Sequence, residues 1–319
     1  MIDWYQLTPA DTLFFRGAEP MEAGQLSAAA LFPPPVSVIL GALRSEALGQ
    51  KNISFADYKR GVYPAEVAAL LGKSGEPPPF AVTAILLKKA DDYYLPCPAH
   101  WFTEKDSIGA KKKILRGKAP EQSTAASLGL HSSAELYLPM VLAEGEPVTL
   151  NGHWLRLRQG CLDADEIIDE DLSPSSVFYD TEPRTGIALD EKRHVKEGAL
   201  YSSGHICLRP DVSLVIAIDR DLGLRQDGTL FLGGEKRVCG YKEIAAPALP
   251  IPPNQPALYL ALTPVELTTE IFPHVFAAGK PAMLAGWDLH TGFHKSSSTW
   301  LPAGSVFAKK INNCLPLLR

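Results

Sequence analysis

The chain has 319 residues, with 31 lysines and arginines against 36 aspartates and glutamates, so its formal net charge is −5. This balance excludes a protein that binds nucleic acid through its net charge, and contact with a polyanion would have to come from local basic clusters. A hydrophobic content of 46% provides for a packed core, and the length predicts about two domains. The 27 prolines predict many loops and short elements.

The cysteines and the N-terminus predict a cytoplasmic protein. The five cysteines are scattered without a CxxC pair, which is typical of reduced thiols and excludes a zinc knuckle local in sequence. The opening MIDWYQ has no basic region, so we expect no signal peptide. Residues 23–43 are uncharged, but three consecutive prolines interrupt them and exclude a membrane span.

The first part of the chain predicts a strand, two helices and two strands. Residues 2–7 are typical of a strand, and residues 36–48 have the apolar period of a helix that begins after Pro35 and stops at Gly49. Residues 64–71 predict a shorter helix ended by Gly72. Strands are expected at residues 80–88 and 93–95.

Two runs of opposite charge follow. Residues 104–122 carry five lysines and an arginine with little apolar pattern, which predicts a mobile basic loop. Residues 163–171 contain six acidic side chains in nine positions, and we expect a solvated loop. The glycine and spacing of a calcium-binding EF-hand are missing there.

The second part predicts mainly strands. Residues 184–189 and 199–206 form a long β-hairpin around a polar tip at 190–198, and residues 211–219, 229–232 and 259–263 are further strands. Residues 247–256 carry five prolines and predict an extended connector. The order of elements indicates an α+β protein with two ferredoxin-like (RRM-like) domains of antiparallel sheet and long inserted loops and hairpins, at residues 1–172 and 173–319.

Known catalytic motifs are largely missing from the sequence. His290 and His294 have the i, i+4 spacing of a zinc protease, but Thr291 stands where that motif has its glutamate, so a loop is expected. FLGGEKR (residues 231–237) lacks the Walker spacing and predicts either a hairpin turn or a glycine turn that brings cations to a phosphate. No GxSxG occurs, and we expect no catalytic residue, metal or cofactor.

Two further features admit two interpretations each. The predicted hairpin tip carries Lys192, Arg193, His194 and Lys196, which form either a solvated turn or a basic finger on a nucleic-acid backbone. The neighbouring residues Phe14 and Phe15, near the N-terminus, either pack in the core or stack on an RNA base.

Five motifs occur together and in order along the chain. They are LTPADTLFFRG (7–17), LFPPPVSVILGALR (31–44), EPRTGIALDEKRHVKEGALY (182–201), FLGGEKR (231–237) and GWDLHTGFHKSSSTWLPAGSVF (286–307). With this set the chain resembles the RAMP-superfamily subunit three of the type III-B (Cmr) CRISPR effector complex. The family usually continues past the last motif into a glycine-rich segment, whereas this sequence ends with AKKINNCLPLLR.

The resemblance implies a non-catalytic subunit for antiviral defence. Such a subunit has two ferredoxin-like domains, caps the 5′ handle of the CRISPR RNA (crRNA), and packs against the large polymerase-like subunit and a backbone RAMP subunit. Within the motifs, the resemblance implies RNA-binding roles for Arg16, Arg184, Lys236, Arg237 and Lys295. The four tip residues join this set by charge and position, whereas the basic run at residues 111–116 has no family motif.

Two other functions remain open. Other RAMP proteins cleave CRISPR repeat RNA without a metal, and His194 beside Lys192 and Lys196 is the local candidate for that acid–base chemistry. A plain protein–protein adaptor would make no contact with RNA.

Overall fold

The computed structural model describes residues 2–15, 17, 30–105, 111–119, 140–250, 256–288, 290–311 and 314–317. The chain forms two compact units, each assembled from three segments. Unit 1 comprises Met1–Val82, Tyr179–Ala245 and Met283–Ser298, and unit 2 comprises Thr83–Phe178, Ala246–Ala282 and Thr299–Arg319. The segments of the two units therefore alternate along the sequence. The boundary expected between two domains after residue 172 stays a prediction.

The main sheet of unit 1 has the strand order β13-β1-β15-β14. Its strands are β1 (Asp3–Pro9), β13 (Val212–Ile218), β14 (Asp227–Phe231) and β15 (Val238–Ile244). β1 pairs antiparallel with both β13 and β15, so the first predicted strand is confirmed as an inner strand. Every residue of β13, which lies within the strand expected at residues 211–219, is buried.

Helix α1 (Val36–Gln50) begins where the sequence predicts but runs past Gly49. The Gln50 side chain donates to the Tyr241 hydroxyl at 2.6 Å and accepts from the Arg225 backbone N–H at 3.0 Å, which holds the last turn against β15. The predicted stop at Gly49 is therefore wrong because tertiary contacts outweigh the cost of glycine in a helix.

Two short helices follow in the same unit. The sequence analysis missed α2 (Phe55–Arg60), which is capped by Ser54 accepting from the Asp57 N–H at 3.1 Å. α3 (Ala65–Leu71) ends at Gly72, as predicted. Beyond them, β19 (Ala282–Leu284) precedes the small antiparallel pair β20 (Trp287–Asp288) and β21 (Phe293–His294).

Unit 2 is also built from antiparallel strands. Four of them have the order β10-β8-β3-β2, namely β2 (Val82–Lys89), β3 (Asp92–Pro96), β8 (His153–Arg156) and β10 (Leu172–Pro174). Four others have the order β18-β23-β16-β24, namely β16 (Leu258–Ala261), β18 (Val275–Ala277), β23 (Val306–Phe307) and β24 (Cys314–Leu317). Their core contains Ala261, Leu301 and Phe307.

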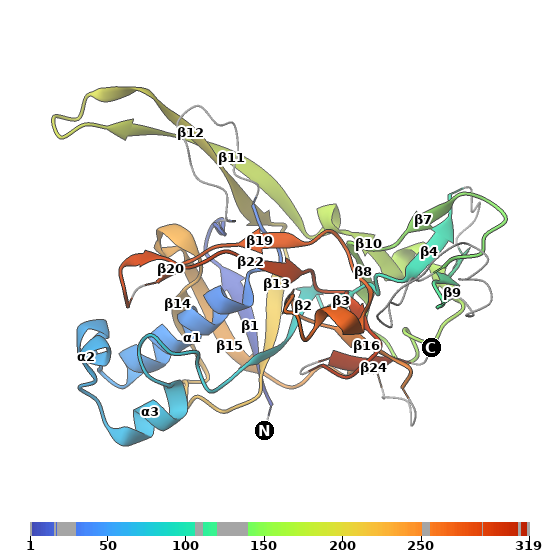
Figure 1. Ribbon diagram of the computed structural model, residues 1–319, viewed down its shortest axis with the longest axis horizontal. Coiled ribbons are helices and arrows are strands. Elements are labelled where there is room, and N and C mark those ends of the chain that lie inside the picture. Colours follow the sequence, from blue (N-terminus) through green and yellow to red (C-terminus); the bar gives the residue numbers. More distant parts are fainter. Residues whose placement is uncertain are drawn as a thin grey trace. The chain divides into compact units, whose positions relative to one another are not determined.

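Short strands complete unit 2. They are β4 (Trp101–Glu104), β5 (Lys111–Lys113), β6 (Leu115–Arg116), β7 (Pro147–Thr149), β9 (Glu166–Ile168), β17 (Val265–Glu266) and β22 (Ser298–Leu301). The whole is an α+β fold dominated by antiparallel sheet, as predicted (Figure 1).

The two charged runs, expected as separate loops, pair with each other. β5 and β9 form an antiparallel ladder. Three ion pairs accompany it: Lys111–Glu166 at 3.8 Å, Lys112–Asp169 at 2.7 Å and Arg116–Asp165 at 3.0 Å. The loop prediction is thus wrong where β5 and β9 pair, because opposite charges lie side by side. The acidic run is solvated as expected, since its acidic side chains other than Asp171 are exposed. Residues 106–110 and 120–122 of the basic run lie outside the described residues.

All five cysteines are free thiols, in agreement with the expected absence of disulfides. Among the described residues, no helix combines the length and hydropathy needed to cross a bilayer.

Candidate nucleic-acid interface

The predicted hairpin is a long two-stranded arm of unit 1 (Figure 1). It consists of β11 (Tyr179–Leu189) and β12 (Val195–Leu208), paired from Tyr179↔Leu208 to Leu189↔Val195. At about 3.3 Å per residue, β11 extends for about 36 Å. The arm is therefore longer than the sequence predicts, and its turn is shorter, at residues 190–194.

Asp190 organises the tip of the arm. One carboxylate oxygen accepts from the backbone N–H groups of Lys192 and His194, each at 2.8 Å, and Arg193 has a positive φ of 61°. The side chains of Lys192, Arg193 and His194 are exposed. His194 Nδ1 lies 3.6 Å from the second Asp190 oxygen. Lys196 follows in β12, where the structure describes its backbone alone. The loop thus turns its described cationic side chains to solvent.

The base of the arm is joined to the segment at residues 11–15. Leu13 and Ile206 form a β-bridge with two backbone hydrogen bonds of 2.8 Å. Beside it the Phe14 ring stacks on the His205 ring, with centroids 4.8 Å apart and planes at 15°. This segment therefore fixes the base of the arm to unit 1.

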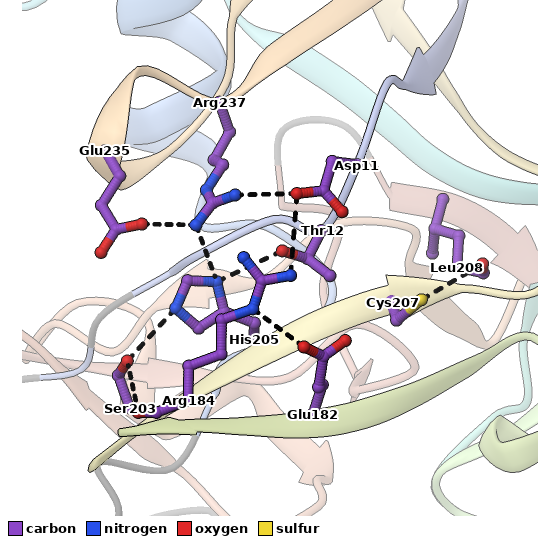
Figure 2. Close-up of polar contacts among 10 residues, drawn as sticks. All are labelled: Asp11, Thr12, Glu182, Arg184, Ser203, His205, Cys207, Leu208, Glu235 and Arg237. Carbon is purple, nitrogen blue, oxygen red and sulfur yellow. Dashed lines mark hydrogen bonds and ion pairs between the residues drawn. The ribbon is translucent and has the colours of Figure 1, made fainter. Parts of the chain in front are cut away.

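Two arginines meet at the base on one carboxylate (Figure 2). Asp11 Oδ2 lies 3.0 Å from Arg237 Nη1 and 3.6 Å from Arg184 Nη2. Each arginine has a second acidic partner: Glu235 lies 2.5 Å from Arg237, and Glu182 lies 2.9 Å from Arg184. The two predicted site residues of the base are thus already engaged in ion pairs within the chain.

His205 is buried beneath these ion pairs and is held from both sides (Figure 2). Its Nδ1 lies 3.4 Å from Thr12 Oγ1 and 3.5 Å from Arg237 Nη2. Because a guanidinium only donates, Nδ1 accepts, and Nε2–H then donates to Ser203 Oγ at 3.2 Å. Burial, and after it the Arg237 charge, lowers the pKa of His205 below its usual value, which favours this neutral tautomer.

The Gly-Gly turn packs on the same segment. An alanine Cβ at Gly233, where φ is +86°, would lie 2.5 Å from the Phe14 carbonyl oxygen. The Gly234 N–H donates to that oxygen at 2.9 Å, so it is already bonded within the protein. Phe14 and Phe15 are 8% and 1% exposed, so of the two interpretations the structure supports packing in the core.

The first part of the closing motif, residues 286–298, lies elsewhere in unit 1. His290 Nδ1 lies 3.0 Å from Ser74 Oγ, and its ring rests on Gly75. Lys295 is exposed, and its N–H donates to the Gly286 carbonyl at 2.8 Å. Within the described residues, no group of three or more His, Cys, Asp or Glu side chains could hold a metal ion.

The predicted residues therefore fall into three groups. Arg184 and Arg237 meet at the base of the arm, with Lys236 exposed on the turn between Glu235 and Arg237. Lys192, Arg193, His194 and Lys196 lie at its far end, and Lys295 is on the closing motif. Arg16 lies outside the described residues. The sequence analysis missed Asp11, Thr12 and His205, because their partners are up to 226 residues away in the chain.

Comparison with known proteins identifies the family. The family model described as CRISPR-associated protein (Cas_Cmr3) matches residues 5–257, well over half of the chain. Comparison with curated protein sequences finds no match.

Two solved structures share the fold. A chain of type III-B Cmr-beta bound to cognate target RNA and AMPPnP is 17% identical, with a TM-score of 0.55, over 95% of this chain and 85% of that one. A chain of type III-B Cmr-beta bound to cognate target RNA alone is 19% identical, with a TM-score of 0.55, over 96% and 86%. The family match shows that the chain belongs to the Cas_Cmr3 family of CRISPR-associated proteins.

Proposed function

We propose that the chain is a non-catalytic structural subunit of a type III-B CRISPR effector complex, which binds crRNA and caps its 5′ handle in antiviral defence. Family membership supports a place in such a complex, and the fold shared with a chain of an RNA-bound type III-B assembly supports RNA as a partner. The cytoplasm, where guide RNA is found, is its proposed location.

The observation that carries the RNA-binding role is the cationic tip of the arm. Lys192 and Arg193 are exposed, and within the described residues neither has a carboxylate at ion-pair distance. Arg184 and Arg237, by contrast, are neutralised by Asp11 and by neighbouring glutamates. Free cations on a narrow arm can approach a phosphate backbone and release its counterions on contact.

The proposed partners are the crRNA 5′ handle, the large polymerase-like subunit and a backbone RAMP subunit. We also keep the ferredoxin-like class as the proposed domain fold. The four-stranded antiparallel sheet within unit 1, which has α1 against β14, supports that class. Pulling down the tagged full-length chain and identifying the bound proteins and small RNA tests the partners, and recovery of neither would contradict them.

A charge-reversal pair tests the arm directly. The double variant Lys192→Glu, Arg193→Glu should bind a labelled single-stranded CRISPR repeat RNA more weakly, and its salt slope should fall by roughly 0.7 per lost phosphate contact. The matched control is Lys59→Glu, Arg60→Glu, which reverses an adjacent Lys-Arg pair on α2 of the same unit. Equal affinity and equal salt slope in the two double variants would refute RNA binding by the tip.

The non-catalytic role is tested with His194. This side chain is exposed, and its Nδ1 faces Asp190 at 3.6 Å. A His–carboxylate pair is also the arrangement that a metal-independent endoribonuclease could use. Purified protein incubated with repeat RNA should leave it intact. Cleavage that His194→Ala abolishes would replace the scaffold role by the endoribonuclease.

A further inference from the structure

The arginine pair at the base of the arm converges on one exposed carboxylate. We propose that Asp11 occupies a phosphate-binding position formed by Arg184 and Arg237, and that an RNA phosphodiester displaces it. Asp11 is then an internal competitor that weakens RNA binding at the base of the arm. This inference rests on the proposed function, because it assigns a second contact to the same RNA.

The two arginines are held in place independently of Asp11. The Arg237 side chain is 17% exposed, with Nη2 bonded to Glu235, and the Arg184 side chain is 33% exposed, with Nε bonded to Glu182. Since each keeps its glutamate when Asp11 moves away, both guanidinium groups stay directed at the same point. A preorganised pair of guanidiniums is the arrangement that recognises the oxygens of a phosphate.

Asp11 is the exposed member of the cluster. Its side chain is 61% exposed, and an ion pair at such a position contributes little to stability, so exchange of its partner requires little free energy. A hydrogen bond from the Thr12 N–H, followed by the charges of Arg184 and Arg237, lowers the pKa of Asp11, so it is ionised at neutral pH. A phosphodiester carries the same single negative charge and also offers two oxygens, so it can take the same place.

The ion pairs that Asp11 forms with Arg184 and Arg237 should have a measurable effect on RNA binding. The carboxylate that a phosphate displaces stays beside the RNA and attracts cations, so the net release of counterions is smaller while Asp11 carries its charge. Removing the carboxylate charge should therefore tighten RNA binding and also steepen its dependence on salt. Asp11→Asn keeps the shape of the side chain and an oxygen for the Thr12 N–H while removing the charge.

The test compares Asp11→Asn with Asp180→Asn in the full-length chain. Asp180 forms an ion pair with Arg209 at 2.9 Å at the base of the same arm but takes no part in the arginine pair. With labelled single-stranded repeat RNA, Asp11→Asn should bind about fivefold more tightly, the factor given by one unit charge about 4 Å away in water. Its salt slope should rise by about 0.7. Asp180→Asn and Asp11→Glu should bind like the wild type.

The outcomes separate this inference from the proposed function. Unchanged or weaker RNA binding by Asp11→Asn, or loss of its folded state in a melting curve, would show that the ion pairs of Asp11 are structural. Either result would overturn the inference. If the tip variants weaken binding in that case, the proposed function stands. If Asp11→Asn tightens binding while the tip variants have no effect, the competitor role stands and the tip is not the RNA contact.

Discussion

Replacing Gly233 by alanine should destabilise the protein more than the same change at Gly61. Both glycines have positive φ, +86° and +76°, so a side chain is strained at either position. At Gly61 an added Cβ meets nothing within 4 Å, whereas at Gly233 it lies 2.5 Å from the Phe14 carbonyl oxygen and 2.9 Å from the Phe15 ring. The ψ angles differ, 18° at Gly61 and −164° at Gly233, so Gly61 is in the left-handed region whereas Gly233 is in a region that is essentially limited to glycine. The two variants therefore differ in backbone strain as well as in the clash.

The magnitude follows from these two contributions. Left-handed backbone costs a side chain about 1–2 kcal/mol, which is the whole expected effect of Gly61→Ala. At Gly233 the turn must also move away from Phe14, and it then loses the 2.9 Å hydrogen bond from the Gly234 N–H, which contributes about 1 kcal/mol. Displacing the buried Phe15 ring adds about 1 kcal/mol more. With about 1–3 kcal/mol for its own backbone strain, Gly233→Ala should therefore cost about 3–5 kcal/mol in total.

Urea unfolding followed by circular dichroism measures both variants against the wild type. The expected result is a lower midpoint for each, with the larger decrease for Gly233→Ala and slopes like that of the wild type. Equal losses in the two variants would refute the reasoning, because the close approach of the turn to Phe14 would then have no energetic effect.

Three further predictions concern other parts of the chain. His100 is 1% exposed, neither ring nitrogen has a hydrogen-bond partner within the described residues, and burial, with Arg116, lowers its pKa to about 4. Below about pH 6.5 the imidazole therefore binds a proton in the unfolded chain but not in the folded chain. Between pH 7 and pH 5, the free energy of unfolding of the wild type should fall by about 2 kcal/mol more than that of His100→Phe, as measured by urea titration. Equal losses in the two proteins would contradict this. The double variant Lys112→Asp, Asp169→Lys exchanges the two charges of one ion pair, and its stability in thermal melts should stay within about 1 kcal/mol of the wild type. Each single variant should be less stable than the double variant. Equal stability of the single and double variants would show that the pair does not interact. The exposed Cys207 should react first with a thiol reagent, because burial raises the pKa of Cys239 to about 12, and peptide mapping that finds Cys239 labelled first would refute the assignment.

Locally encoded elements could be predicted from the sequence. The start of α1 after Pro35, the first strand and the hairpin each depend on neighbouring residues, and the structure has them. The missed α2 also had local signals, because Ser54 supplies its N-cap and Gly61 its left-handed end. Its six residues carry too little apolar periodicity to indicate a helix.

Contacts between distant residues could not be predicted in this way. The ion pair between Asp11 and Arg237 joins residues 226 positions apart, and no local pattern selects Asp11 from the other acidic residues. The basic and acidic runs are an intermediate case, since their opposite charges could have indicated pairing of the β5 and β9 segments. At the candidate site, the cationic tip was therefore predictable as a local feature, and the ion pairs at its base were not.

The interleaved segments have a consequence during synthesis. Unit 1 requires Met283–Ser298, and unit 2 requires Thr299–Arg319, so neither is complete until the ribosome has made nearly the whole sequence. At about 5–20 residues per second, the first strand waits many seconds for β13 and β15. The unpaired strands of the nascent chain are therefore exposed during that time, and a cut at any point between Thr83 and Ser298 should leave both units unfinished.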